Sequence, residues 1–95
     1  MQIIKIDTDF TPETHTISAQ SAQSGAIITG SVIVRIAVRG THAHIKIGYN
    51  PTATSEDILM PENTIEYFQI RSGQQVAFIK SGDAGTGEIN FCAID

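Results

Sequence analysis

Apolar and polar side chains alternate along residues 32–47, VIVRIAVRGTHAHIKI, on both sides of a Gly40-Thr41 break. Successive side chains of a β-strand point to opposite faces, so this alternation predicts two strands that each have one buried and one solvated face. The first strand would place Val32, Val34, Ile36 and Val38 opposite Arg35 and Arg39. The second would place Ala43, Ile45 and Ile47 opposite His42, His44 and Lys46. The pattern indicates a β-sheet protein.

Further short extended segments are separated by turn residues at intervals of about ten residues. They span residues 58–60, 65–71, 75–80 and 88–94, with weaker candidates at 2–6 and 16–19. The Gly40-Thr41 break fits either a tight hairpin or a bulge in one long bent strand. The sequence therefore predicts an all-β fold, a β-sandwich or jelly-roll-like barrel of about seven to nine short antiparallel strands with an extended N-terminal arm.

The N-terminal quarter differs in composition from the rest of the chain. Small polar residues make up SAQSAQSG at 18–25, and such repeats more often form flexible connectors than packed elements. We therefore expect residues 1–25 to be an arm and connector and residues 26–95 to be the β-sandwich body of a single domain. The arm carries apolar side chains at Ile3, Ile4, Ile6 and Phe10. These four form the predicted contact with a partner. The arm is expected either to pair along an edge of the chain's own sheet or to reach a neighbouring subunit by strand addition.

Charge is unevenly distributed along the chain. Residues 1–48 carry four basic and three acidic side chains, whereas residues 49–95 carry two basic and seven acidic ones. Nucleic-acid binding depends on cations that neutralise phosphates, so this balance argues against a DNA or RNA partner. Cys92 is the only cysteine, which excludes an internal disulfide and favours a packed thiol. We expect synthesis in the cytoplasm and no membrane association, because neither a secretory signal nor a run of roughly 20 apolar residues is present.

Few residues suggest site chemistry. His42 and His44 share a strand face and could offer two imidazoles to a metal ion, with further ligands from His15, a carboxylate or a symmetry axis. A solvated polar face is the favoured interpretation, and Lys46 beside the pair would repel a cation. No nucleophile elbow or phosphate-binding loop is present, so we predict no enzymatic activity, no catalytic residues and no cofactor. A carbohydrate surface at Tyr49, Asn50 and Tyr67 is a weak alternative because aromatic residues are few.

The order of features from Val32 to Ile94 resembles that of small accessory virion proteins of tailed bacteriophages. The similar segments are a strand followed by HIKIGYNPTAT, LMPENTIEYFQI, SGQQVAFI and a glycine-rich turn into a last strand. In this chain they lie at His44–Thr54, Leu59–Ile70, Ser72–Ile79 and Gly85–Ile94. The resemblance implies a β-sandwich that decorates or cements a capsid, or that belongs to a neck or tail assembly, without catalytic residues.

The functional expectation is therefore a non-enzymatic virion structural protein, made in the host cytoplasm and incorporated into the virion. A head decoration subunit that clamps neighbouring capsid proteins is the first hypothesis, with a homo-oligomer, preferably a trimer, as the working form. The predicted contact with the capsid or another partner is then made by Ile3, Ile4, Ile6 and Phe10. The alternative is a tail, neck or fibre module, either a ring-forming completion protein or a module that binds a host surface.

Overall fold

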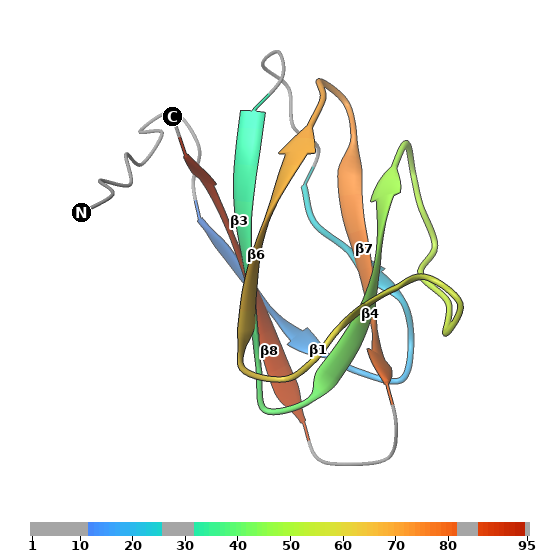
Figure 1. Cartoon of the computed structure of the whole chain (residues 1–95). Helices are drawn as coiled ribbons and strands as arrows, with labels where there is room; N and C mark the ends of the chain where they lie inside the picture. The colour runs from blue at the N-terminus through green and yellow to red at the C-terminus, as the bar shows by residue number, and fades with distance from the viewer. Residues whose placement is uncertain (1–11, 26–31, 82–85, 95) are drawn as a thin grey trace, which may run out of the picture.

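The computed structural model describes residues 12–25, 32–81 and 86–94 of the chain (Figure 1). Eight strands are found in these ranges. They are β1 (Glu13–Ile17), β2 (Ala22–Gln23), β3 (Val32–Arg39), β4 (His42–Gly48), β5 (Ile58–Met60), β6 (Thr64–Ile70), β7 (Gln75–Ser81) and β8 (Gly87–Ile94). The same ranges hold no helix long and apolar enough to span a membrane.

The strands form two four-stranded sheets that pack face to face, as Figure 1 shows. Sheet A has the spatial order β1-β8-β3-β6, and sheet B has the order β2-β7-β4-β5. Every strand pair is antiparallel. The predicted all-β sandwich of short antiparallel strands is therefore confirmed.

The core lies between the two sheets and contains the predicted apolar faces. From β3 and β4 it receives side chains that are at most 2% exposed, namely Val34, Ile36, Val38, Ala43 and Ile45. The two largest buried rings come from opposite sheets, because Phe78 lies on β7 and Phe91 on β8, with their centroids 5.7 Å apart. Burial of each such ring stabilises the fold by roughly 1.5–3 kcal/mol relative to its exposure.

The Gly40-Thr41 break is neither a hairpin nor a bulge. β3 pairs only with β6 and β8, whereas β4 pairs with β5 and β7, so the break carries the chain from sheet A to sheet B. Gly40 adopts a φ of 84°, and a Cβ there would lie 2.9 Å from the Thr86 carbonyl oxygen. The corner thus packs backbone against backbone on the start of β8, which alternation in one strand pair cannot reveal.

Residues 12–25, which belong to the expected arm and connector, pair with strands of both sheets. β1 pairs with β8 in sheet A, and β2 pairs with β7 in sheet B. The buried Ser24 hydroxyl accepts a hydrogen bond from the Val76 N–H at 3.0 Å, and the Ser24 N–H donates to the Val76 carbonyl at 2.9 Å. The small polar residues of the repeat are ordered because their hydrogen bonds are made to the sandwich.

Part of the arm prediction concerns residues that the structure does not describe. Ile3, Ile4, Ile6 and Phe10 lie outside the described residues, as do residues 26–31, where the body was expected to begin. The prediction that these four side chains form a partner contact therefore stays a prediction.

Candidate functional site

The outer face of sheet A, which is the side turned away from sheet B, exposes large apolar side chains. Ile33 on β3 is 47% exposed, and Ile65 and Tyr67 on β6 are each 48% exposed. The strand register places them close together, since Tyr67 lies opposite Arg35 and Ile65 lies opposite Ala37. Sheet A therefore presents an apolar surface across β3 and the neighbouring edge strand.

Two arginines point outward from the same strand, and their surroundings differ. Arg39 lies opposite Glu88 on β8, and its Nε donates to Glu88 Oε1 at 3.1 Å. Arg35 lies between Tyr67 and Cys92 in the register, so neither neighbouring strand offers it a carboxylate. No ion pair to Arg35 is found within the described part of the chain. Within the described residues, the half-buried Arg35 thus has no carboxylate partner.

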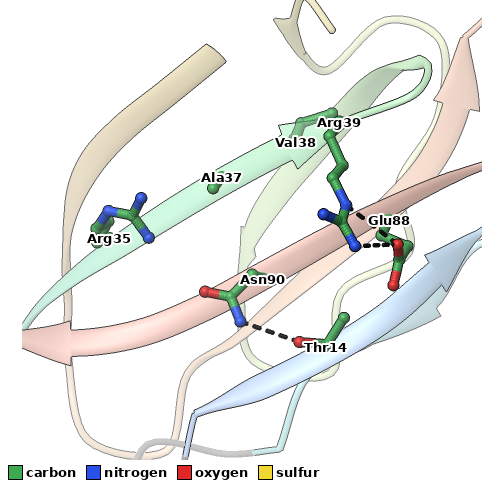
Figure 2. Close-up of a pocket in the computed structure, with 7 residues that line it drawn as sticks. All are labelled: Thr14, Arg35, Ala37, Val38, Arg39, Glu88 and Asn90. Atoms are coloured by element: carbon green, nitrogen blue, oxygen red, sulfur yellow. Dashed lines mark hydrogen bonds and ion pairs between the residues drawn. The ribbon is translucent and has the colours of Figure 1, made fainter. Parts of the chain in front are cut away.

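A shallow hollow of about 310 Å³ lies between the arginines (Figure 2). Ala37 is the residue between them on this face, and its methyl group leaves space that two long side chains border. Asn90 and Thr14 also line the hollow, and Asn90 Nδ2 donates a hydrogen bond to Thr14 Oγ1 at 3.0 Å. Figure 2 shows the Arg39–Glu88 and Asn90–Thr14 contacts on one side of the hollow and Arg35 apart from them. The hollow can therefore receive a short side chain that reaches Arg35.

This combination of side chains is suited to protein recognition. Tyrosine and arginine are enriched among residues that dominate binding energies at protein interfaces, and half-exposed isoleucines bury further apolar area on contact. A carboxylate that pairs with Arg35 would form a charge-assisted hydrogen bond beside an apolar surround that excludes water. The arrangement fits a partner protein that presents an acidic side chain among apolar ones.

His42 and His44 lie on the outer face of sheet B, and both use their ring nitrogens within the sandwich. His42 Nδ1 accepts a hydrogen bond from the Glu62 N–H at 2.9 Å. His44 Nδ1 lies 3.1 Å from the Asp57 carbonyl oxygen and its Nε2 lies 3.1 Å from Ser81 Oγ. With Nδ1 as the donor, Nε2 accepts from the serine hydroxyl. Nowhere in the described ranges do three or more His, Cys, Asp or Glu side chains form a group that could hold a metal ion.

The three residues weighed as a carbohydrate surface are not brought together. Tyr49 and Asn50 follow β4 in sheet B, whereas Tyr67 lies on β6 in sheet A. Asn50 Oδ1 accepts from Gln23 Nε2 at 3.1 Å, so this amide helps to hold the β2 segment. Cys92 is buried with 7% exposure, as expected for a packed thiol.

Sequence reasoning assigned Arg35 to a solvated face and did not identify the surface around it. A signal was present, because Ile33 and Ala37 are apolar residues on the otherwise polar face of β3. Their role becomes visible only when the register places β6 alongside.

Comparison with known proteins gives no match. No protein-family model, no curated protein and no solved structure is significantly similar to this chain. Function is therefore inferred from the residues of the outer face of sheet A and from the order of features along the sequence.

Proposed function

We propose that this protein is a non-enzymatic structural subunit of a bacteriophage virion that decorates or cements the capsid. The observation that carries the proposal is the outer face of sheet A, where Ile33, Ile65 and Tyr67 surround an arginine that has no carboxylate partner among the described residues. The resemblance to accessory virion proteins from Val32 to Ile94 supports the choice of partner.

In this function the outer face of sheet A lies against a capsid protein, with Arg35 paired to an acidic side chain of that protein. Ile3, Ile4, Ile6 and Phe10 add a further contact, on the capsid protein or on a neighbouring subunit. A homo-oligomer, preferably a trimer, multiplies a weak contact, since linked sites bind a repeating surface with high avidity. The working location is the virion, after synthesis in the host cytoplasm.

Cosedimentation tests the proposal. The purified protein is mixed separately with heads and with tails from the phage that encodes it, and each mixture is sedimented. We expect the protein to pellet with heads, and Arg35→Glu to lose at least about tenfold in affinity because a like charge then faces the partner carboxylate. Lys46→Glu is the matched control, since Lys46 is exposed on the outer face of sheet B.

The outcomes separate the candidate functions. Pelleting with tails alone would replace the capsid role by the tail or neck alternative. Sedimentation with neither particle would refute a virion role, and equal losses for the two charge reversals would refute the outer face of sheet A as the contact.

A further inference from the structure

The four edge strands of the described sandwich differ in length. In sheet B, β2 has two residues and β5 has three, which is too short for a joining strand to pair along. In sheet A, β1 has five residues. The backbone directly after β1 is bonded to the other sheet, because the Ser18 carbonyl accepts a hydrogen bond from the Lys80 N–H of β7 at 2.8 Å. β6 has seven residues and pairs with a described strand on one side only, β3. β6 is thus the longest edge strand among the described residues.

β6 carries a charge that selects what can pair with it. Glu66 shares a strand face with Phe68 and Ile70, which pack on or within the core, yet Glu66 itself is exposed. An inward-facing charge on an edge strand discourages unspecific strand addition, because an apolar strand would desolvate it. No ion pair to Glu66 is found in the described ranges. A strand that joins β6 therefore needs a cation opposite Glu66 and apolar residues on both sides of that cation.

Residues 2–7 of this chain, QIIKID, have this pattern, because Lys5 stands between Ile4 and Ile6. If Lys5 lies opposite Glu66 in an antiparallel pairing, Ile4 lies opposite Tyr67 and Ile6 lies opposite Ile65. The remaining isoleucine, Ile3, then lies opposite Phe68 on the inner side. Shifting the segment by two residues in either direction, which preserves the faces, removes the charge pair, so one register is favoured over its neighbours.

The joining segment must come from a second molecule. In this register Asp7 lies beside Thr64, one strand beyond β6, whereas Glu13 begins β1 at the opposite edge of sheet A. The lateral separation is four strand spacings, roughly 19 Å. The six residue steps from Asp7 to Glu13 span at most about 20–22 Å when fully extended. A straight path from Asp7 to Glu13 would pass through β8, β3 and β6. A path over the side chains of these strands is longer than the six residue steps can span.

We propose that residues 2–7 of one copy add antiparallel to β6 of a second copy, with Lys5 opposite Glu66. The added strand extends sheet A and places Ile4 and Ile6 beside Tyr67 and Ile65 on its outer face. Repeated from copy to copy, this head-to-tail exchange closes into a ring when the rotation between copies allows it. The inference does not require a capsid, so its test is independent of the cosedimentation experiment.

The test uses charge reversal on the full chain. The molar mass of Lys5→Glu, of Glu66→Lys and of the double variant is measured by light scattering on a sizing column over a concentration series. We expect a wild-type oligomer, an apparent dissociation constant raised roughly tenfold in each single variant, where like charges face each other, and recovery in the double variant. Glu56→Lys is the control, because Glu56 is exposed in the loop before β5.

Mixing the two single variants separates exchange between molecules from pairing within one molecule. In a mixture, the glutamate introduced by Lys5→Glu can pair with the lysine introduced by Glu66→Lys in the other molecule. The unchanged Lys5 of the second variant can likewise pair with the unchanged Glu66 of the first, so the oligomer should recover. Pairing within one chain predicts no recovery on mixing and would overturn the proposal. A monomeric wild type at about 100 µM, or a double variant no better than the single ones, would also overturn it.

A cross-link provides a measurement that does not depend on the strength of association. Lys5→Cys combined with Glu66→Cys places two thiols opposite each other on paired strands, at a separation that a disulfide can bridge. After mild oxidation we expect covalent dimers and larger species on a non-reducing gel. A band that stays at the monomer mass, whether internally linked or unlinked, would contradict exchange between copies. Cys92 remains in this variant because it is buried.

Discussion

Gly87→Ala should destabilise the protein strongly, although it adds a single methyl group. Gly87 begins β8 and lies against the corner that carries the chain from sheet A to sheet B. A Cβ at this position would lie 2.5 Å from the Arg39 carbonyl oxygen, 2.6 Å from Thr41 Cγ2 and 2.9 Å from the Thr41 nitrogen. Two of these three atoms belong to the backbone, so the clash cannot be relieved by rotating a side chain alone.

The size of the effect follows from the displacement required. Ordinary contact begins near 3.4 Å, so the Arg39 carbonyl must retreat by about 0.9 Å. Arg39 is also paired with Glu88 across β3 and β8, which resists this shift. Overpacking that moves the backbone costs typically 1–3 kcal/mol, and this site is at the upper end, about 3 kcal/mol. For a domain of this length the melting temperature should fall by about 12–24 °C.

Thermal and urea unfolding followed by far-UV circular dichroism measure this change. Gly48→Ala is the matched control, because a Cβ at Gly48 would meet only Pro51 Cβ at 3.9 Å and the position has no positive φ. Restricting the unfolded chain should make this control more stable by about 0.4–1 kcal/mol. If Gly87→Ala melts within about 2 °C of the wild type, the close backbone approach at the corner is wrong.

Three further outcomes are expected. Ser24→Ala should reduce the free energy of unfolding by about 1–3 kcal/mol in urea titrations, because the buried Val76 N–H loses its acceptor. The exposed Ser55→Ala should change this free energy by less than about 0.5 kcal/mol. Equal values for the two variants would support the prediction that residues 18–25 are a loose connector. Ala37→Leu should fill the hollow beside Arg35 and weaken binding to phage heads at least about tenfold. The melting temperature should stay within about 3 °C of the wild type. Unchanged binding would show that the hollow is not part of the contact. The Cys92 thiol should react with a thiol reagent far more slowly in the native protein than in urea, and equal rates would contradict its burial.

The strands could be predicted because their signal is local. Alternation along residues 32–47 placed Val34, Ile36 and Val38 on one face, and the structure buries all three. The segments expected at 58–60, 65–71, 75–80 and 88–94 correspond to β5, β6, β7 and β8 with boundaries that differ by at most one residue. Side-chain periodicity and turn residues are properties of neighbours in the chain, so no tertiary information was needed.

Residues 18–25 show where local reasoning fails. The composition of SAQSAQSG indicated a connector, yet Ala22–Gln23 pairs with β7 and Ser24 is buried. The partners that order this segment, Val76 and Gln75, lie more than 50 positions away in the sequence. A low-complexity segment becomes a strand when distant backbone groups satisfy its hydrogen bonds, and its composition carries no record of them.

For the candidate surface, too, one part follows from the sequence and another part only from the tertiary structure. The sequence alone determined that Arg35 points away from the core, because its neighbours Val34 and Ile36 are apolar and alternate with it. Only the tertiary structure decided that Glu88 pairs with Arg39 while Arg35 faces Tyr67 and Cys92, since this depends on the register of three strands. Periodicity along one strand sets the face of a side chain, whereas its neighbours on that face are set by pairing with strands from distant parts of the chain.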